Sequence, residues 1–293
     1  MAIFTAGEIG MLTVRNLDIL VDVTRALAED WGSGDATSIL LPPQQIAKAS
    51  LITREPMIVC GQAWVEGVFT AVNPRITIEW LVKEGEKLPQ AQPLCYVTGP
   101  VADLLTAERT ALNFLQTLSG TATITHRYVT AIFGTKARLL DTRKTIPGLR
   151  IAQKYAVQCG GGCNHRMGLY DAYLIKENHI LACGSVSQAI QLARKKNPSL
   201  FLEIEVENLM DLQVALREKP DRILLDNFSL DQLREAVTLN KHAGCALEAS
   251  GGICLENIRA VAETGVDYIS VGDLTKSVTA IDLSFRLLDP GVF

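Results

Sequence analysis

The stretch from residue 200 to residue 227, LFLEIEVENLMDLQVALREKPDRILLDN, decides the fold class. It begins with an apolar run over 200–206, continues through a segment of helical periodicity over 208–218, and ends in a second apolar run over 222–225. Short apolar runs rich in β-branched residues predict buried strands, and apolar residues that recur every three or four positions predict a helix. A strand, a helix and a second strand in this order predict a parallel βαβ unit.

The same pattern recurs through the second half of the chain. Further apolar runs occupy 137–140, 172–175, 246–247 and 268–271, and further helices are expected over 186–196, 229–242 and 255–265. Polar clusters close the runs at regular intervals, with members at Lys176, Glu205, Asp226, Ser250 and Gly272. In a β/α barrel all such strand ends surround one mouth, where enzymes of that fold work. An open doubly wound sheet binds ligands only at its switch point, so repeated polar strand ends favour a barrel.

The first half of the chain predicts a different, α+β domain with mostly antiparallel strands. Residues 13–29 have helical spacing, and strand-like segments separated by turns are expected over 47–53, 57–64, 76–82 and 93–97. A long helix over 104–118, with Ala107, Ala111, Leu115 and Leu118 on one face, should link the two halves.

Composition excludes several classes of protein. The 293 residues are 48% hydrophobic and 20% charged, which is a globular composition. The net charge of −4 argues against a sequence-independent grip on nucleic acid or on an anionic membrane. No apolar run approaches the roughly 20 residues that a bilayer span needs. The start of the chain has no basic segment before an apolar one, as a secretory signal would have. We expect neither nucleic acid nor membrane as a partner.

The seven cysteines favour a cytoplasmic protein with reduced thiols, because their number is odd and no CxxC occurs. Cys159, Cys163 and His165 lie close together in sequence and could be interpreted as metal ligands. The glycine-rich interval does not match common zinc spacing, and no second ligand pair follows. We therefore prefer thiols without a metal at these positions.

Residues 137–176 concentrate positive charge. They hold seven basic side chains and two acidic ones, which leaves this segment of an acidic protein with a charge of +5. A guanidinium binds a carboxylate in bidentate fashion, so such a cluster suits a small dicarboxylate or phosphoryl ligand. The candidates at or near strand ends are Arg143, Lys144, His165, Arg166 and Lys176. On these grounds alone, Arg109 is an ordinary surface residue of the long helix.

Glycine turns close the last two predicted strands. One turn is Ser250 followed by Gly251 and Gly252, and the other contains Gly272. Backbone N–H groups in such turns bind phosphate, and barrels often hold phosphate at their last two strands.

Two acids end adjacent strands. Glu205 and Asp226 are placed where carboxylates bind Mg²⁺ or sugar hydroxyls. Glu203 and Glu207 share the face of Glu205 by the two-residue period of a strand, so spacing does not select among the three glutamates.

These residues lie in ordered motifs that resemble those of quinolinate phosphoribosyltransferases. The motifs are AERTALN (107–113), LSGTAT (118–123), DTRKTIPGLR (141–150), KYAV (154–157), GGG (160–162), NHR (164–166), LIKENHI (174–180), EVE (205–207), LDN (225–227), EASGGI (248–253) and GVDYISVG (265–272). The resemblance runs from about residue 17 to the end of the chain. So many motifs in order are highly specific.

The resemblance implies an α/β protein with an N-terminal α+β sandwich domain followed by an incomplete parallel β/α barrel. We expect the sandwich over residues 1–118, joined by the C-terminal segment 277–293, and the barrel with the active site over 119–276. The implied enzyme is a pentosyltransferase of NAD biosynthesis that uses Mg²⁺. It joins 5-phosphoribosyl 1-pyrophosphate to quinolinate with decarboxylation, giving nicotinate mononucleotide, pyrophosphate and CO₂. A homodimer is implied, with a higher oligomer of dimers as an alternative.

The resemblance also assigns the site residues. Quinolinate would contact Arg143, His165, Arg166 and Lys176, together with Arg109 of the partner subunit. Phosphoribosyl pyrophosphate and Mg²⁺ would contact Lys144, Glu205 and Asp226, and the 5′-phosphate would bind Ser250, Gly251, Gly252 and Gly272. Thr142 is a further expected substrate-binding residue. The expected catalytic residues are Lys144, Lys176, Glu205 and Asp226, of which Glu205 and Asp226 hold the metal directly or through water.

Two positions depart from the family pattern. Asp273 and Lys276 stand where many relatives have a small residue and a histidine near the 5′-phosphate. Lys276 can still supply a cation there, whereas Asp273 adds a negative charge that would weaken phosphate binding.

Three other functions fit parts of the pattern. A related enzyme would use another pyridine or heterocyclic acid. Lys176 follows two apolar residues at a strand end, where a desolvated amine could form the Schiff base of an aldolase. A non-catalytic sensor of phosphorylated metabolites would bind without turnover. The density of acids, bases and glycine turns disfavours the aldolase and the sensor.

Overall fold

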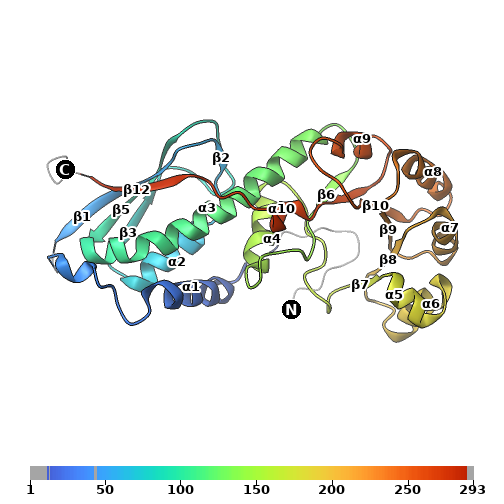
Figure 1. The fold of residues 1–293 in the computed structure, drawn as a ribbon, viewed down its shortest axis with the longest axis horizontal. Coiled ribbons are helices and arrows are strands. Elements are labelled where there is room, and N and C mark those ends of the chain that lie inside the picture. The colour runs from blue at the N-terminus through green and yellow to red at the C-terminus, as the bar shows by residue number, and fades with distance from the viewer. Residues whose placement is uncertain (1–11, 13, 43–44, 289–293) are drawn as a thin grey trace. The chain divides into compact units, whose positions relative to one another are not determined.

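The computed structural model describes residues 12, 14–42 and 45–288 of the chain (Figure 1). These residues form two compact units. The first, which we call the sandwich unit, comprises the described residues of 12–126, 146–161 and 277–288. The second, the barrel unit, comprises residues 127–145 and 162–276. Among the described residues, no helix is both long enough and apolar enough to cross a membrane.

The sandwich unit is built on a four-stranded antiparallel sheet in the order β12-β1-β5-β3. Its strands are β1 (Ile46–Thr53), β3 (Thr77–Trp80), β5 (Gln92–Pro100) and β12 (Leu283–Leu287), and β2 (Met57–Ile58) pairs with β4 (Lys87–Leu88). Its helices are α1 (Asn16–Trp31), a 3₁₀ turn (Ser38–Leu40), α2 (Gln62–Val72), the first part of α3 (Val101–Ala131) and α4 (Arg150–Cys159). Helices α1 to α3 gather on one side of this sheet (Figure 1).

Helix α2 replaces part of a strand that the sequence predicted over 57–64. The strand ends at Ile58, and the helix begins at Gln62 after Gly61, whose φ of +114° suits glycine. Glu84 accepts hydrogen bonds from the backbone N–H groups of Gly61 and Gln62, at 2.8 and 3.1 Å. A carboxylate at these otherwise unpaired donors stabilises a helix start. The cap comes from 22 residues away, so no local pattern predicts it.

Residues 119–126 and 146–161, which we expected in the barrel domain, lie in the sandwich unit. The reason is packing. Helix α3 continues unbroken past residue 118, and its Leu118 and Ala122 share one hydrophobic cluster with the sandwich core. Ala152 and Ala156 of α4 belong to the same cluster. Burial of these side chains therefore assigns both segments to the sandwich unit.

The barrel unit contains a six-stranded parallel sheet in the order β6-β11-β10-β9-β8-β7. Its strands are β6 (Arg138–Leu140), β7 (Tyr173–Ile175), β8 (Leu202–Val206), β9 (Arg222–Asp226), β10 (Ala246–Ser250) and β11 (Tyr268–Ser270). Its helices are the end of α3, α5 (Glu177–Cys183), α6 (Val186–Lys196), α7 (Leu209–Glu218), α8 (Leu230–Asn240), α9 (Ile258–Ala262) and α10 (Asp273–Lys276). Strands β6 and β7 form the two edges of the sheet, so the barrel is incomplete, as expected.

Local sequence explains why helices follow these strands. Ser185, Asn208 and Ser229 each accept a hydrogen bond from the backbone N–H three residues on, and so cap α6, α7 and α8. The apolar face of each helix is buried, as in α6, where Ala189, Ile190 and Ala193 are buried. In Figure 1 these three helices lie along the outside of the sheet. The arrangement leaves the carboxyl ends of the strands open for a site.

Candidate functional site

A cavity of about 280 Å³ lies at the carboxyl ends of the barrel strands. Its lining residues are Thr142, Arg143, Lys144, His165, Arg166, Leu174, Lys176, Glu205, Leu224, Asp226, Glu248, Ser250 and Ser270. The volume lies near the lower end of the range for small-molecule sites. The structure thus brings together the cations, acids and hydroxyls that the sequence analysis placed at this mouth.

Two arginines form the basic side of the cavity. Burial and the nearby charge of Arg143 lower the pKa of Arg166. Arg166 Nη1 donates to the carbonyl of Ala172 at 3.2 Å, whereas its buried Nε has no hydrogen-bond partner among the described residues. Two guanidinium groups that repel each other beside a cavity favour an anionic ligand between them.

His165 is held by charged residues beneath the cavity. Its Nε2 lies 2.9 Å from Glu203 and 3.6 Å from Glu248, both fully buried. Burial lowers the pKa of His165, but the two carboxylates outweigh burial and raise it above its ordinary value. Its Nδ1 accepts the N–H of Arg166 at 2.7 Å, so Nε2 carries the proton toward Glu203. The ring is therefore fixed in orientation and tautomer.

Arg222 completes this buried network. Its Nη1 lies 2.9 Å from Glu248 and 4.0 Å from Glu203. Burial and the charge of Glu203 raise the pKa of Glu248 to about 7. Burial acts in the same direction on Glu203, but the contacts with His165 and the charge of Arg222 together outweigh burial and lower the pKa of Glu203. The network supports the cavity with charges that are largely buried.

Acids also line the cavity, among them Glu205 and Asp226. Lys176 Nζ donates to Glu205 at 2.5 Å. Burial raises the pKa of Glu205, Lys176 opposes this, and the nearby charge of Asp226 adds to burial. Carboxylate oxygens of Glu177, Glu205 and Glu207 lie within 4.8 Å of one another. Hard oxygen donors with excess negative charge are the ligands that Mg²⁺ prefers, so the residues fit this ion.

The structure separates the three glutamates that spacing left equivalent, two of which lie in β8, while Glu207 follows its end. Glu203 is fully buried in the network with His165, Glu205 lines the cavity, and Glu207 is exposed. The three glutamates are distinguished by how deeply each is buried, and not by the two-residue period of a strand.

The glycine turns lie beside the cavity without lining it. Gly251 has a φ of +92°, and a Cβ at this position would lie 2.2 Å from Asn227 Oδ1. Only glycine fits this turn. At Gly272 an added Cβ would lie 3.0 Å from the side chain of Lys144, so this turn and that cation are close neighbours. Gly252, with a φ of +59°, follows Gly251 in the same turn as Ser250.

The two departures from the family pattern pair with each other. Lys276 Nζ lies 3.0 Å from Asp273 Oδ1 on the short helix α10. The negative charge that the sequence analysis expected to weaken phosphate binding is therefore partly balanced by its neighbour.

Arg109 does not line the cavity. It lies on α3 in the sandwich unit, its side chain is 59% exposed, and its guanidinium is 3.9 Å from Glu108. Arg109 is therefore not among the residues that line the cavity of its own chain.

Comparison with known proteins identifies the family. A model of the quinolinate phosphoribosyl transferase C-terminal domain matches residues 121–286, and a model of the N-terminal domain matches residues 35–119. The chain belongs to the quinolinate phosphoribosyltransferase family.

Relatives within this family match most of the chain. It is 43% identical to the nicotinate-nucleotide pyrophosphorylase [carboxylating] of Mycobacterium leprae, over 90% of this chain and 95% of that protein. It is 36% identical to quinolinate phosphoribosyltransferase [decarboxylating] 1 of Nicotiana glauca, over 98% and 88%. The solved nicotinate-nucleotide pyrophosphorylase of Francisella tularensis superposes with a TM-score of 0.92 and 47% identity, over 95% of this chain and 99% of that one.

The sequence analysis missed several lining residues of this quinolinate phosphoribosyltransferase cavity. They are Leu174, Leu224, Glu248 and Ser270. Each lies two positions before a strand-end residue that was predicted, namely Lys176, Asp226, Ser250 and Gly272. Successive strand residues point to opposite faces, so the residue two positions earlier shares the inward face. This period was the signal that could have found them.

Proposed function

We propose that this chain transfers phosphoribose from 5-phosphoribosyl 1-pyrophosphate to quinolinate with decarboxylation, which yields nicotinate mononucleotide, pyrophosphate and CO₂ in NAD biosynthesis. Membership of the quinolinate phosphoribosyltransferase family supports this reaction. The observation that carries it is one cavity lined by two arginines, two lysines and three carboxylates. Quinolinate carries two negative charges and needs cationic side chains. A phosphorylated sugar that develops positive charge needs carboxylates.

The basic side would bind quinolinate. Arg143 and Arg166 each offer a planar guanidinium that can take a carboxylate in bidentate fashion. The fixed Nε2–H tautomer of His165 and its neighbouring charges would orient the ring of the substrate. Lys176 supplies a further cation at the boundary with the acids.

The acidic side would bind phosphoribosyl pyrophosphate and Mg²⁺. Glu205 and Asp226 would hold the ion, directly or through water, and Lys144 would bind the pyrophosphate. When bound, Mg²⁺ supplies positive charge that stabilises the departing pyrophosphate. Thr142, whose hydroxyl accepts the N–H of Lys144 at 3.0 Å, would orient this loop. The 5′-phosphate would lie on Ser250, Gly251, Gly252 and Gly272.

The chemistry follows from charge. Departure of pyrophosphate leaves a cationic ribosyl carbon, which the carboxylates of Glu205 and Asp226 would stabilise. The pyridine nitrogen attacks this carbon and becomes positively charged. As the neighbouring carboxylate leaves as CO₂, the electron pair of its bond stays on the ring carbon, where the positive nitrogen stabilises it. That carbon then takes up a proton from water. Arg143 and Arg166 must therefore hold a dicarboxylate without preventing one carboxylate from leaving.

The enzyme would work as a cytoplasmic homodimer in which Arg109 of the partner subunit completes each pocket. The exposure of Arg109 and its long contact with Glu108 leave the guanidinium accessible to a second subunit. The cysteine composition supports the cytoplasm. Assembly of dimers into a higher oligomer is compatible with the same arrangement.

One assay tests the function. The protein is incubated with phosphoribosyl pyrophosphate, Mg²⁺ and quinolinate labelled in the carboxylate next to the ring nitrogen. We expect nicotinate mononucleotide and labelled CO₂ in equal amounts. Consumption of nicotinate instead of quinolinate would indicate a related enzyme with another acid. Substrate binding without turnover would indicate a sensor.

The aldolase alternative is disfavoured by one contact. Lys176 Nζ is engaged by Glu205 at 2.5 Å, so this amine is not free to attack a carbonyl. Borohydride should therefore trap no adduct at Lys176.

A further inference from the structure

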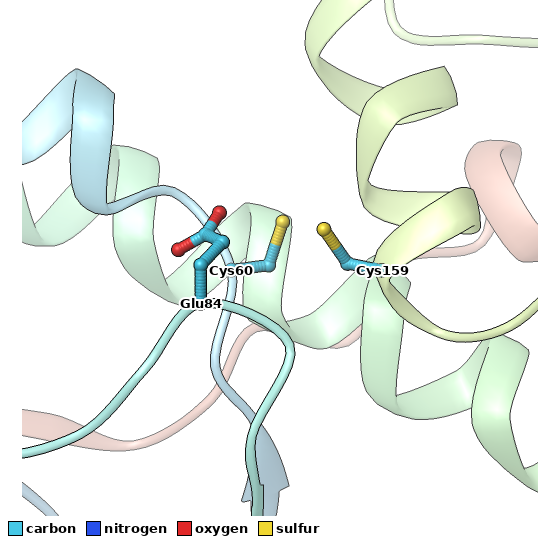
Figure 2. A group of neighbouring side chains, drawn as sticks. All are labelled: Cys60, Glu84 and Cys159. Carbon is cyan, nitrogen blue, oxygen red and sulfur yellow. The ribbon is translucent and has the colours of Figure 1, made fainter. Parts of the chain in front are cut away.

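Three side chains of the sandwich unit converge outside the cavity (Figure 2). Cys60 directly precedes the turn into α2, Glu84 lies between β3 and β4, and Cys159 is the last residue of α4. The two sulfurs and a carboxylate oxygen of Glu84 all lie within 4.8 Å of one another. Figure 2 shows both sulfurs directed toward each other, with the carboxylate beside Cys60. Residues far apart in sequence thus form one compact cluster.

Hydrogen bonds fix this cluster in place. Each carboxylate oxygen of Glu84 accepts one backbone N–H, from Gly61 or Gln62. The backbone N–H of Cys60 donates to Ser119 Oγ at 3.0 Å, and Ser119 Oγ donates to the carbonyl of Cys60 at 3.1 Å. Such outer contacts orient metal ligands in proteins.

The protonation chemistry of the cluster suits a cation. Burial raises the pKa of the Cys60 thiol and of the Glu84 carboxyl, so burial disfavours their charged forms when no cation is near. The hydrogen bond with Cys60 lowers the pKa of Cys159. Tyr155 lies one turn earlier on α4 and hydrogen-bonds to Glu84 and to Cys159. A dication would replace the thiol protons, which are released on binding.

We propose that Cys60, Glu84 and Cys159 form a binding site for one thiophilic divalent cation of the zinc class. Two thiolates and a carboxylate fill three positions of a tetrahedral ion, and water takes the fourth. Soft sulfur ligands favour zinc over magnesium. None of these three residues is a proposed Mg²⁺ ligand. Among the described residues, the other two possible ligand clusters contain no sulfur and share no residue with this one.

The ion would join three segments of the sandwich unit. It would bind Cys60 before α2, Glu84 in the β3–β4 turn and Cys159 at the end of α4, and only the folded chain brings them together. A ligand that binds only the folded state stabilises it. In this proposal Cys60 is the second sulfur ligand beside Cys159. Cys163, which lies close to Cys159 in sequence, is not a ligand.

Cobalt titration tests the site in the full-length protein, reduced and freed of metal with a chelator. Thiolate ligands produce a sulfur-to-cobalt charge-transfer band that carboxylates and imidazoles do not. We expect the band to saturate at one Co²⁺ per chain and to disappear when Zn²⁺ is added. Zn²⁺ should also raise the thermal unfolding midpoint.

Variants assign the ligands. Cys60→Ala and Cys159→Ala should each lose the charge-transfer band and the thermal shift. Glu84→Gln should keep the band but weaken affinity at least about tenfold. Cys95→Ala is the matched control, because Cys95 is equally buried in β5 yet belongs to no possible ligand cluster among the described residues. Circular dichroism verifies folding, and the less buried Cys159 supplies the second variant if Cys60→Ala does not fold.

Two results would overturn the proposal. One is the absence of a charge-transfer band in folded, reduced protein at saturating Co²⁺. The other is a band that survives in Cys159→Ala. A Cys60–Cys159 disulfide in air-oxidised protein, together with no cobalt binding after reduction, would replace the metal site with a redox pair.

Discussion

Lys176 Nζ donates a hydrogen bond to Glu205 Oε2 over 2.5 Å, and this ion pair joins the ends of the neighbouring strands β7 and β8. Lys176 is proposed to contact quinolinate, and Glu205 is proposed to hold Mg²⁺. The pair therefore links the two substrate-binding halves of the cavity. It also keeps Glu205 charged against burial and the nearby Asp226, both of which raise its pKa.

Removal of Lys176 alone should destabilise the protein more than removal of both partners. In Lys176→Met the pKa of Glu205 rises further above its unfolded value, so the folded state binds more protons. Stability relative to wild type should then fall as pH rises above the ordinary glutamate pKa of 4.5. The double variant Lys176→Met/Glu205→Gln should lose this pH dependence. Urea unfolding should give a coupling free energy of about 0.5–3 kcal/mol, and additive effects would show that the contact is unimportant.

Lys144→Ala and Asp226→Ala should impair the use of phosphoribosyl pyrophosphate more than the binding of quinolinate. Both residues line the cavity, and both are proposed to contact phosphoribosyl pyrophosphate or its metal ion. Steady-state kinetics should show lost activity, whereas calorimetric titration should show nearly unchanged quinolinate affinity. Lys241→Ala, at an exposed position after α8, is the control. A loss of quinolinate affinity above about 3 kcal/mol in a folded variant would show that the assignment is wrong.

Mixing two inactive variants should restore activity if Arg109 acts in the partner subunit. Arg109→Ala keeps an intact barrel, and Arg143→Ala keeps an intact Arg109. A twofold dimer with one chain of each contains one pocket with both arginines and one with neither. Random mixing makes half of the dimers hybrids, so about a quarter of all pockets should recover.

The control for this experiment mixes Arg143→Ala with Arg166→Ala. Both arginines line the same cavity of one chain, so every hybrid pocket lacks one of them and no activity should return. Mass spectrometry verifies subunit exchange. Activity that stays at the level of the single variants, despite exchange, would show that Arg109 serves its own chain or none.

Glu248 should make the protein less stable as pH rises. Its pKa is about 7 in the folded protein and about 4.5 in the unfolded chain, so the folded state binds more protons between these values. Ionisation of Glu248 beside Glu203 therefore costs stability above pH 4.5. As pH rises to about 7, the free energy of unfolding of Glu248→Gln should increase relative to that of the wild-type protein. Glu235→Gln, at an exposed position on α8, is the control. A difference that does not vary with pH would contradict the expectation.

The barrel was predictable because its signals are local. The alternation of apolar runs and amphipathic segments between 200 and 227 predicted β8, α7 and β9, with boundaries close to those observed. Polar residues at the strand ends predicted the cavity, because parallel strands bring their carboxyl ends to one edge. Ordered motifs carried the resemblance that the family comparison confirmed.

Other features depended on contacts between residues far apart in sequence. The carboxylate of Glu84 caps α2, so a segment expected as strand became helix. Burial within one hydrophobic cluster assigned α4 to the sandwich unit. The buried network around His165 needs strands β8, β9 and β10 side by side.

The sequence by itself determined the class of fold, the family and the residue types around the cavity, because periodicity and short motifs are properties of neighbouring residues. Only the tertiary structure decided which glutamate of β8 faces the cavity and which cysteines meet. Glu203 and Glu205 lie in β8 and Glu207 follows its end, and their differing burial depends on what surrounds them. Cys60 and Cys159 are 99 residues apart, and folding of the sandwich unit brings them together.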